Sequence, residues 1–180
     1  MSDNSTTSRY NVDVKGHAKA KEVFIQGLRN QHAVEMQAIA TIEKQLGRYD
    51  NYADLHARMQ QDLTNSKAQA ARLEKLLSHH GTSASGTKET VTSVVGTVAG
   101  MVHITADDQV VKDVLAATGY KHYEIASYNS LLAMAQAIGD TDCPPVLQES
   151  VAEEQEMAEW LQKHTPEIVA AYLHRFVNEA

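Results

Sequence analysis

Apolar side chains recur along most of the chain at alternating steps of three and four residues, which is the spacing of one helix face. This periodicity predicts long helices over about residues 18–47, 55–80, 106–138 and 144–164. Thr165 as an N-cap and Pro166 at a first helical position predict a separate short C-terminal helix. The apolar side of that short helix would hold Ile168, Tyr172, Leu173 and Phe176.

The segment between the second and third helices is rich in Gly, Val and Thr, and reads ETVTSVVGTVAGMVHI over residues 89–104. Its composition suits a strand, but a single strand would have no partner, so we expect a short, tightly packed helix. Short links join the first helix to the second and the third to the fourth. The connection between the second and third helices is long enough to cross from one end of the bundle to the other. The predicted fold is an all-α, ferritin-like four-helix bundle with one long crossover, an extra short helix within it, and a short C-terminal helix.

Residues 1–17 are rich in Ser, Thr and Asn and show little periodicity, so we expect a disordered N-terminal tail. Residues 18–180 are expected to form a single bundle domain. The formal net charge is −7 and the chain has no long Lys/Arg block, which argues against nucleic acid as a partner. No run reaches the roughly 18–20 apolar residues of a membrane span, so no membrane association is expected.

The chain has one cysteine, Cys143, which excludes an internal disulfide and a zinc site built on a CxxC motif. A reducing cytoplasm fits this cysteine usage, and the expected location is cytoplasmic. Cys143 stands in a turn beside two prolines with no neighbouring feature that would lower its pKa, so we expect it to be inert. His79 and His80 are expected to be helix-end residues rather than ligands.

Each of the four predicted helices has its apolar stripe interrupted near the midpoint by an ionisable residue. The four residues are Glu35, Asp62, Lys121 and Glu154. Helix midpoints in an antiparallel bundle lie at about the same height, so we expect these groups to meet in one central layer. Within one helical turn of this layer lie His122, Glu124 and Glu153. Of these, Glu124 could instead lie on the flank of its helix.

Carboxylates that meet in a core repel one another and are costly to desolvate, so they need a cation, a base or water. One interpretation is a metal centre, whose candidate ligands are Glu35, His122, Glu124, Glu153 and Glu154. The other is an ion-pair layer in which Lys121 neutralises Glu35, Asp62 and Glu154. Di-metal bundles carry a Glu-x-x-His motif on each of two helices. No predicted helix of this sequence has that motif at its midpoint. The ion-pair interpretation is favoured because the lysine is already present.

Three stretches carry a family resemblance: EVFIQGLRNQHAVEMQ, AATGYKHYEIASYNSLLAMAQAIG and LQESVAEEQEMAEWL. They resemble the YciE/YciF family of bacterial stress-associated ferritin-like proteins, from about Glu22 to Leu161, and HYEIASY is the most specific part. The resemblance implies a ferritin-like bundle, commonly dimeric, with a carboxylate-rich centre suspected of binding two irons. It places the family's metal-layer glutamates on Glu35, Glu124, Glu153 and Glu154.

The chain departs from the family pattern at two helices. Lys121 stands where the third-helix motif EHYE has its first glutamate. On the second helix the pattern HLEET falls on residues 62–66, where its histidine and both glutamates are absent. An ammonium group competes with a metal for the same carboxylates, so these departures weaken the metal interpretation.

Two functions follow as hypotheses, and the sequence assigns neither a catalytic residue nor a firm cofactor. The first is a stress-associated bundle with a degenerate di-metal site, free of metal or weakly metal-binding, that acts through interactions as a homodimer. Its protein partner is unknown. The second is a di-iron protein with ferroxidase-type activity for iron storage or oxidative-stress protection, with iron or manganese as the candidate metals.

Overall fold

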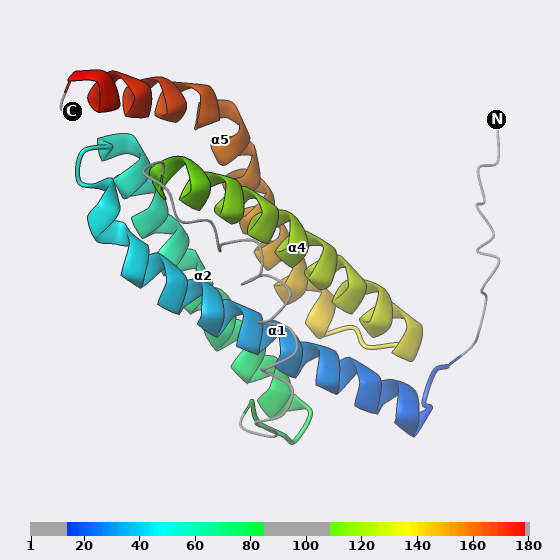
Figure 1. The fold of residues 1–180 in the computed structure, drawn as a ribbon. Coiled ribbons are helices and arrows are strands. Elements are labelled where there is room, and N and C mark those ends of the chain that lie inside the picture. The colour runs from blue at the N-terminus through cyan, green and yellow to red at the C-terminus, as the bar shows by residue number, and fades with distance from the viewer. Residues whose placement is uncertain (1–13, 85–108, 179–180) are drawn as a thin grey trace, which may run out of the picture.

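The computed structural model describes residues 14–84 and 109–178 of the chain (Figure 1). It contains α1 (Ala18–Gln45), the 3₁₀ helix η1 (Leu46–Tyr49), α2 (Ala53–His79), α4 (Gln109–Ile138) and α5 (Cys143–Asn178). The predicted all-α four-helix bundle is confirmed. The short helix expected over residues 89–104, and most of the tail expected over residues 1–17, lie outside the described residues.

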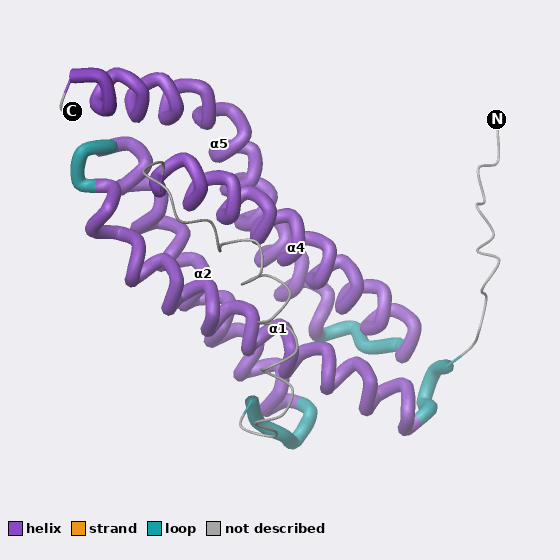
Figure 2. The backbone as a smooth tube through the Cα atoms, in the orientation of Figure 1, coloured by secondary structure: helices purple, strands orange, loops and turns teal. Residues whose placement is uncertain are grey.

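The four helices pack around a common core in a square. Helix α1 packs against α2 and α4, while α5 packs against α4 and α2. Short links make α1 and α2 antiparallel, and likewise α4 and α5 (Figure 2). Helix α2 ends at one end of the bundle and α4 begins at the opposite end, as one long crossover requires (Figure 1).

Helices α2 and α4 end in the same way at the same end of the bundle. Gly81 and Gly139 both adopt a positive φ, of 71° and 76°, which a glycine tolerates without steric cost. The amide that follows each glycine donates to a carbonyl five residues earlier, from Thr82 to Leu77 and from Asp140 to Ala135. These Schellman-type ends stop the two helices side by side and bring the residues of both turns close together.

The core consists of two apolar clusters, one toward each end of the bundle, and every helix contributes to both. The first contains Phe24, Leu28, Leu73, Leu77, Tyr128 and Leu147. The second contains Ile42, Leu55, Met59, Val114, Met157 and Leu161. The polar residues of the helix midpoints lie between these clusters along the sequence of each helix. Apolar burial on both sides therefore holds the midpoints together.

The prediction of a separate short C-terminal helix is wrong, because α5 continues through Pro166 to Asn178. Proline removes one backbone hydrogen bond and crowds the preceding turn, which bends a helix without always ending it. Figure 1 shows α5 bending before its C-terminal arm. The Thr165 hydroxyl donates to the Leu161 carbonyl oxygen at 2.6 Å instead of capping a new helix. Ile168, past the bend, is still buried in the second apolar cluster.

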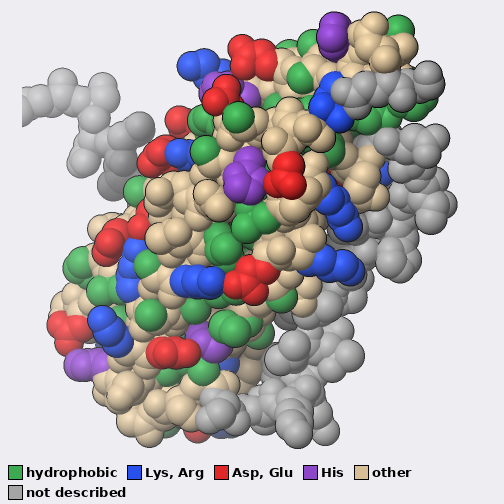
Figure 3. Space-filling model, turned by 90° about the vertical axis from the view of Figure 1, so that its left-hand side faces the viewer, with side chains coloured by type: hydrophobic (Ala, Val, Ile, Leu, Met, Phe, Trp, Pro, Cys, Tyr) green, Lys and Arg blue, Asp and Glu red, His purple; other side chains and the backbone are tan. Residues whose placement is uncertain are grey.

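The outer surface carries charge of both signs. Acidic and basic side chains are interspersed over the face drawn in Figure 3 rather than gathered into a stripe. Among the described helices, none combines the length and the apolar character that a membrane crossing requires.

Candidate functional site: a buried layer of carboxylates around a lysine

Lys121 of α4 is the centre of the polar layer at the middle of the bundle, and its side chain is 2% exposed. Its Nζ lies 3.0 Å from Oδ1 of Asp62 on α2 and 2.9 Å from Oε2 of Glu154 on α5. One helical turn along α4, Oε2 of Glu124 lies 2.9 Å from the same nitrogen. One ammonium group thus joins carboxylates from three helices.

Glu35 of α1 completes the layer without a direct ion pair to the lysine. Its Oε1 accepts hydrogen bonds from Nε2 of Gln31 and from the hydroxyl of Tyr128, both at 2.8 Å. Burial and the nearby charge of Glu154 raise the pKa of Glu35 to about 7, although Lys121 and the two hydrogen bonds oppose the shift. Glu35 is therefore only partly ionised at neutral pH.

The layer holds four carboxyl groups and one ammonium group, and its pKa shifts reduce this imbalance. Burial alone would lower the pKa of Lys121, but Glu124, Asp62 and Glu154 raise it well above its usual range, so the lysine stays charged. Burial raises the pKa of Glu124 well above its usual range, and it also raises the pKa of Asp62. Protonation of some carboxyl groups thus brings the net charge of the layer closer to zero.

Three carboxylates of the layer have the spacing that a cation would need. Glu35, Glu124 and Glu154 each offer one oxygen, and these oxygens lie within 4.8 Å of one another. Oε2 of Glu35, Oε1 of Glu124 and Oε1 of Glu154 are buried and have no hydrogen-bond partner among the described residues. Oxygens of this kind could hold a single hard cation.

The same residues do not fit a di-metal centre. Such a centre takes a glutamate from each of two helices and a Glu-x-x-His from each of the other two. Three residues after Glu124 and Glu154 stand Ser127 and Met157 instead of histidines. The ammonium group of Lys121 lies 2.9 Å from a carboxylate oxygen of each of two of the three candidate ligands, Glu124 and Glu154. The layer therefore already contains its cation.

Two of the residues considered as metal ligands lie outside the layer. His122 is exposed on α4, because it directly follows the buried Lys121 and points to another side of the helix. Glu153 on α5 is partly buried and pairs with Arg72 of α2, whose Nη2 lies 2.6 Å from its Oε1. Glu124, which could have lain on a flank, is instead fully buried in the layer.

The inward-facing stripes of the sequence also carry neutral polar residues, and the structure buries them. Gln31, Ser66, Gln69 and Tyr128 are all fully buried. Their steps of three and four from apolar neighbours predict this inward position, but the spacing alone does not show that Gln31 and Tyr128 bond to Glu35. A buried polar side chain at an apolar position is expected to have a partner in the core.

Comparison with known proteins agrees with this architecture. A family model described as "Domain of unknown function (DUF892)" matches residues 19–174. The crystal structure of a Xanthomonas campestris protein is similar, with 26% identity and a TM-score of 0.74, over 87% of this chain and 97% of that one. The Escherichia coli stress protein YciF has 21% identity and a TM-score of 0.70, over 84% of this chain and 97% of that one.

A ferritin-type protein with a known metal site has the same fold. The bacterioferritin of Desulfovibrio desulfuricans, whose structure contains a diiron site, has 18% identity and a TM-score of 0.68. The match covers 84% of this chain and 83% of that one. At this identity the likeness establishes the ferritin-like fold alone.

Proposed function

The chain belongs to the DUF892 family, and on that premise we propose that it is a ferritin-like protein whose central layer uses Lys121 in place of a metal ion. The bundle then serves as a rigid scaffold that acts through its surface. The observation that carries this proposal is the position of the Lys121 Nζ, within 3.0 Å of carboxylate oxygens from Asp62, Glu124 and Glu154.

Burying an ion pair is seldom a net gain in stability, but removing one partner leaves an uncompensated charge and is strongly destabilising. The lysine therefore stabilises a layer that would otherwise need a metal. A protein without redox chemistry at its centre would act by binding other molecules. The Escherichia coli relative is described as a stress protein, and on that basis we propose a role in the stress response for this chain.

We propose that the protein forms a homodimer through an exposed apolar surface. The C-terminal arm of α5 carries the exposed apolar side chains Leu173, Phe176 and Val177, which are 53%, 52% and 75% exposed. Exposed apolar side chains that lie close together are typical of association surfaces. Light scattering on the full chain tests this proposal. A Leu173→Ser/Phe176→Ser variant should shift the mass toward the monomer, and an unchanged dimer would exclude the arm.

The second candidate is a metal centre, and one observation favours it. The oxygens of Glu35, Glu124 and Glu154 come within 4.8 Å of one another. Carboxylates of this kind can hold iron or manganese, and iron held in this way would support ferroxidase-type chemistry. The metal centre predicts that the parent protein retains metal bound by Glu35, whereas the lysine-centred layer predicts that it does not.

Anaerobic loading with excess Fe(II), removal of free iron and measurement of iron per chain separate the two candidates. We expect the parent and a Glu35→Gln variant to retain the same small amount of iron. A Lys121→Glu variant should gain iron, because the substitution removes the ammonium group and adds a carboxylate. About two irons per chain in the parent, lost on Glu35→Gln, would establish the di-iron alternative and refute the lysine-centred layer.

A further inference from the structure

A second group of metal-ligating side chains lies at the end of the bundle where α2 stops and α4 turns into α5. His80 directly follows α2, Asp140 stands in the turn, and Cys143 is the first residue of α5. We call these three residues the end cluster. The side chains of His80 and Asp140 are 5% and 10% exposed, and Cys143 is fully buried. The fold thus brings His80 beside a cysteine that lies 63 positions further along the chain.

Two of the three distances within the end cluster match the edges of a coordination tetrahedron. Nε2 of His80 lies 3.3 Å from Oδ2 of Asp140 and 3.5 Å from Sγ of Cys143. The first distance is long for a direct hydrogen bond, which is typically about 2.9 Å. Tetrahedral Zn²⁺ with bonds of about 2.0–2.3 Å places its nitrogen and oxygen ligands about 3.3 Å apart, and its nitrogen and sulfur ligands about 3.5 Å apart. One ligand atom from each of the three residues lies within 4.8 Å of the others.

We propose that the end cluster binds one Zn²⁺ ion through Nε2 of His80, a carboxylate oxygen of Asp140 and Sγ of Cys143. A nitrogen, an oxygen and a sulfur ligand together suit zinc, which is borderline in softness. The carboxylate and the thiolate balance the charge of the ion. The site is separate from the central layer, since Cys143 and Glu154 are about 16 Å apart along α5 at 1.5 Å per residue.

Neighbouring groups hold two of the ligands in place. Oδ1 of Asp140 accepts the backbone N–H groups of Asp142 and Cys143 at 3.0 and 2.9 Å, which fixes the carboxyl group and leaves Oδ2 toward His80. The ring of Phe24 packs edge-on against the His80 ring, with centroids 5.6 Å apart and an interplanar angle of 88°. Contacts that orient the ligands in this way reduce the entropy lost when a metal binds.

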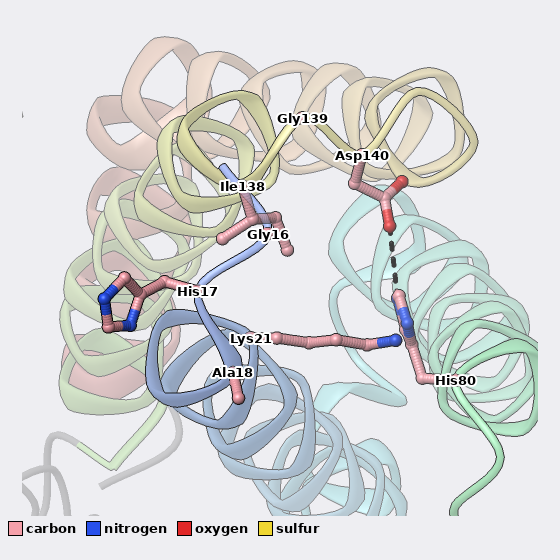
Figure 4. Close-up of a pocket in the computed structure, with 8 residues that line it drawn as sticks. All are labelled: Gly16, His17, Ala18, Lys21, His80, Ile138, Gly139 and Asp140. Atoms are coloured by element: carbon pink, nitrogen blue, oxygen red, sulfur yellow. Dashed lines mark ion pairs between the residues drawn. The ribbon is translucent and has the colours of Figure 1, made fainter. Parts of the chain in front are cut away.

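Two of the three residues of the end cluster face a cavity large enough for an ion and water. His80 and Asp140 line a cavity of about 260 Å³, shared with the start of α1 and the end of α4 (Figure 4). In Figure 4 the ring of His17 points away from His80 and Asp140, so we do not assign it as a ligand. With three protein ligands, the fourth position of the tetrahedron is left for water from the cavity.

The lowered pKa of His80 favours metal binding, whereas the raised pKa of the Cys143 thiol opposes it. Burial lowers the pKa of His80 and the nearby charge of Lys21 adds to this, although Asp140 opposes the shift, and a lowered pKa favours the neutral imidazole. A neutral imidazole presents a lone pair to a metal. Burial raises the pKa of the Cys143 thiol to about 12. A bound cation would displace the thiol proton, as metals do at coordinating thiols.

Cobalt substitution in the full-length protein tests this proposal, because tetrahedral Co²⁺ reports its own ligands spectroscopically. After treatment with a chelator, one Co²⁺ per chain should give intense tetrahedral absorption and a thiolate-to-cobalt charge-transfer band, and Zn²⁺ should displace it. Cys143→Ser should abolish the charge-transfer band. Each of Cys143→Ser, His80→Asn and Asp140→Asn should weaken zinc binding by about tenfold or more, measured by competition with a chromophoric chelator.

Matched controls separate this site from other metal binding. His79→Asn changes the neighbouring histidine, which is half exposed and pairs with Asp142, and should leave zinc affinity as in the parent. Glu35→Gln should also leave it unchanged, which keeps this test independent of the central layer. If circular dichroism shows that Cys143→Ser does not fold, His80→Asn and Asp140→Asn decide the test. Asp140→Asn is expected to fold, because its side-chain oxygen can still accept the backbone amide at the start of α5. A cobalt complex without the charge-transfer band, or parental zinc affinity in the folded variants, would overturn the proposal.

Discussion

The central layer and the end cluster both gather buried ionisable side chains from helices that are distant in sequence, but their positive charge comes from different sources. In the central layer, the Lys121 ammonium lies within 3.0 Å of three carboxylates. In the end cluster, Nε2 of His80 lies from an oxygen of Asp140 and from Sγ of Cys143 at the distances of a zinc tetrahedron, and all three ligand atoms lie within 4.8 Å of one another. In the central layer the basic side chain pairs directly with the carboxylates and removes the need for a metal. At the end cluster Lys21 points toward His80, but the ion pair drawn among these residues joins Asp140 to His80 (Figure 4), which leaves the ligands available to a metal.

Replacing the central cation should produce the largest effect. Lys121→Met keeps the length and apolar bulk of the side chain but removes its charge, and it leaves three carboxyl groups without their partner. We expect the free energy of unfolding at pH 7 to fall by about 3–5 kcal/mol, measured by urea denaturation.

Lys67→Met is the matched control for this substitution. Its Nζ pairs with Glu43 at 2.8 Å, but both side chains are about half exposed. An exposed pair of this kind should contribute about 1 kcal/mol or less. Equal losses for the two variants would show that Lys121 does not neutralise the layer.

The pH dependence of stability should identify Glu35 as a carboxyl group held protonated by the fold. Its pKa is about 7 in the folded chain, above the ordinary value of 4.5. The stability that its protonated form contributes is present below about pH 4.5 and is lost as pH rises through 7. Relative to the parent, Glu35→Gln should therefore become more stable between about pH 5 and 8, by on the order of 3 kcal/mol.

Denaturation of both proteins across this pH range measures the effect, with Glu43→Gln as the control. Glu43 is about half exposed, so its substitution should give a difference from the parent that changes little with pH. A pH-independent difference between Glu35→Gln and the parent would contradict the raised pKa.

Zinc should stabilise the parent through the end cluster and leave the central layer unaffected. At a free zinc concentration about 100 times the dissociation constant, linkage predicts a gain of about 2.7 kcal/mol in the free energy of unfolding. Thermal denaturation with and without zinc should show this gain in the parent and in Lys67→Met. The same gain in Cys143→Ser would place the zinc elsewhere.

Removing a single hydroxyl group from the central layer should have the smallest effect. Tyr128 is fully buried and donates to Oε1 of Glu35. Tyr128→Phe should lower the free energy of unfolding by about 1–2 kcal/mol, because the carboxyl group loses a partner that water cannot replace. Tyr123→Phe is the control at a tyrosine that is 39% exposed, and should change stability by about 0.5 kcal/mol or less.

The helices and the midpoint residues could be predicted because both depend on local spacing. Apolar steps of three and four located the four helices, and the interruption of each stripe marked Glu35, Asp62, Lys121 and Glu154 at one height. The same spacing gave no way to choose the side on which Glu124 and His122 lie. A difference of one or two positions turns a side chain by about 100–200° around a helix, so one of them is buried and the other is exposed.

The end cluster could not be predicted in this way, because it depends on how two helix ends meet. His80 and Cys143 are separated by 63 positions and show no motif of fixed spacing. Each was interpreted alone, as a helix-end residue and as an inert thiol. The bend of α5 was missed for a related reason: Pro166 is compatible both with the start of a helix and with a kink, and burial of Ile168 favours the kink.

The central claim is that Lys121 carries the positive charge of the layer, and nitrogen NMR of its side chain tests this most directly. In ¹⁵N-labelled protein at pH 7, the Lys121 Nζ signal, assigned by its loss in Lys121→Met, should have the shift of a charged ammonium group. Excess Fe(II) added anaerobically should leave that signal unchanged, because the paramagnetic ion does not enter the layer. A neutral amine shift, or a signal broadened away by iron in the parent but not in Glu35→Gln, would contradict the account.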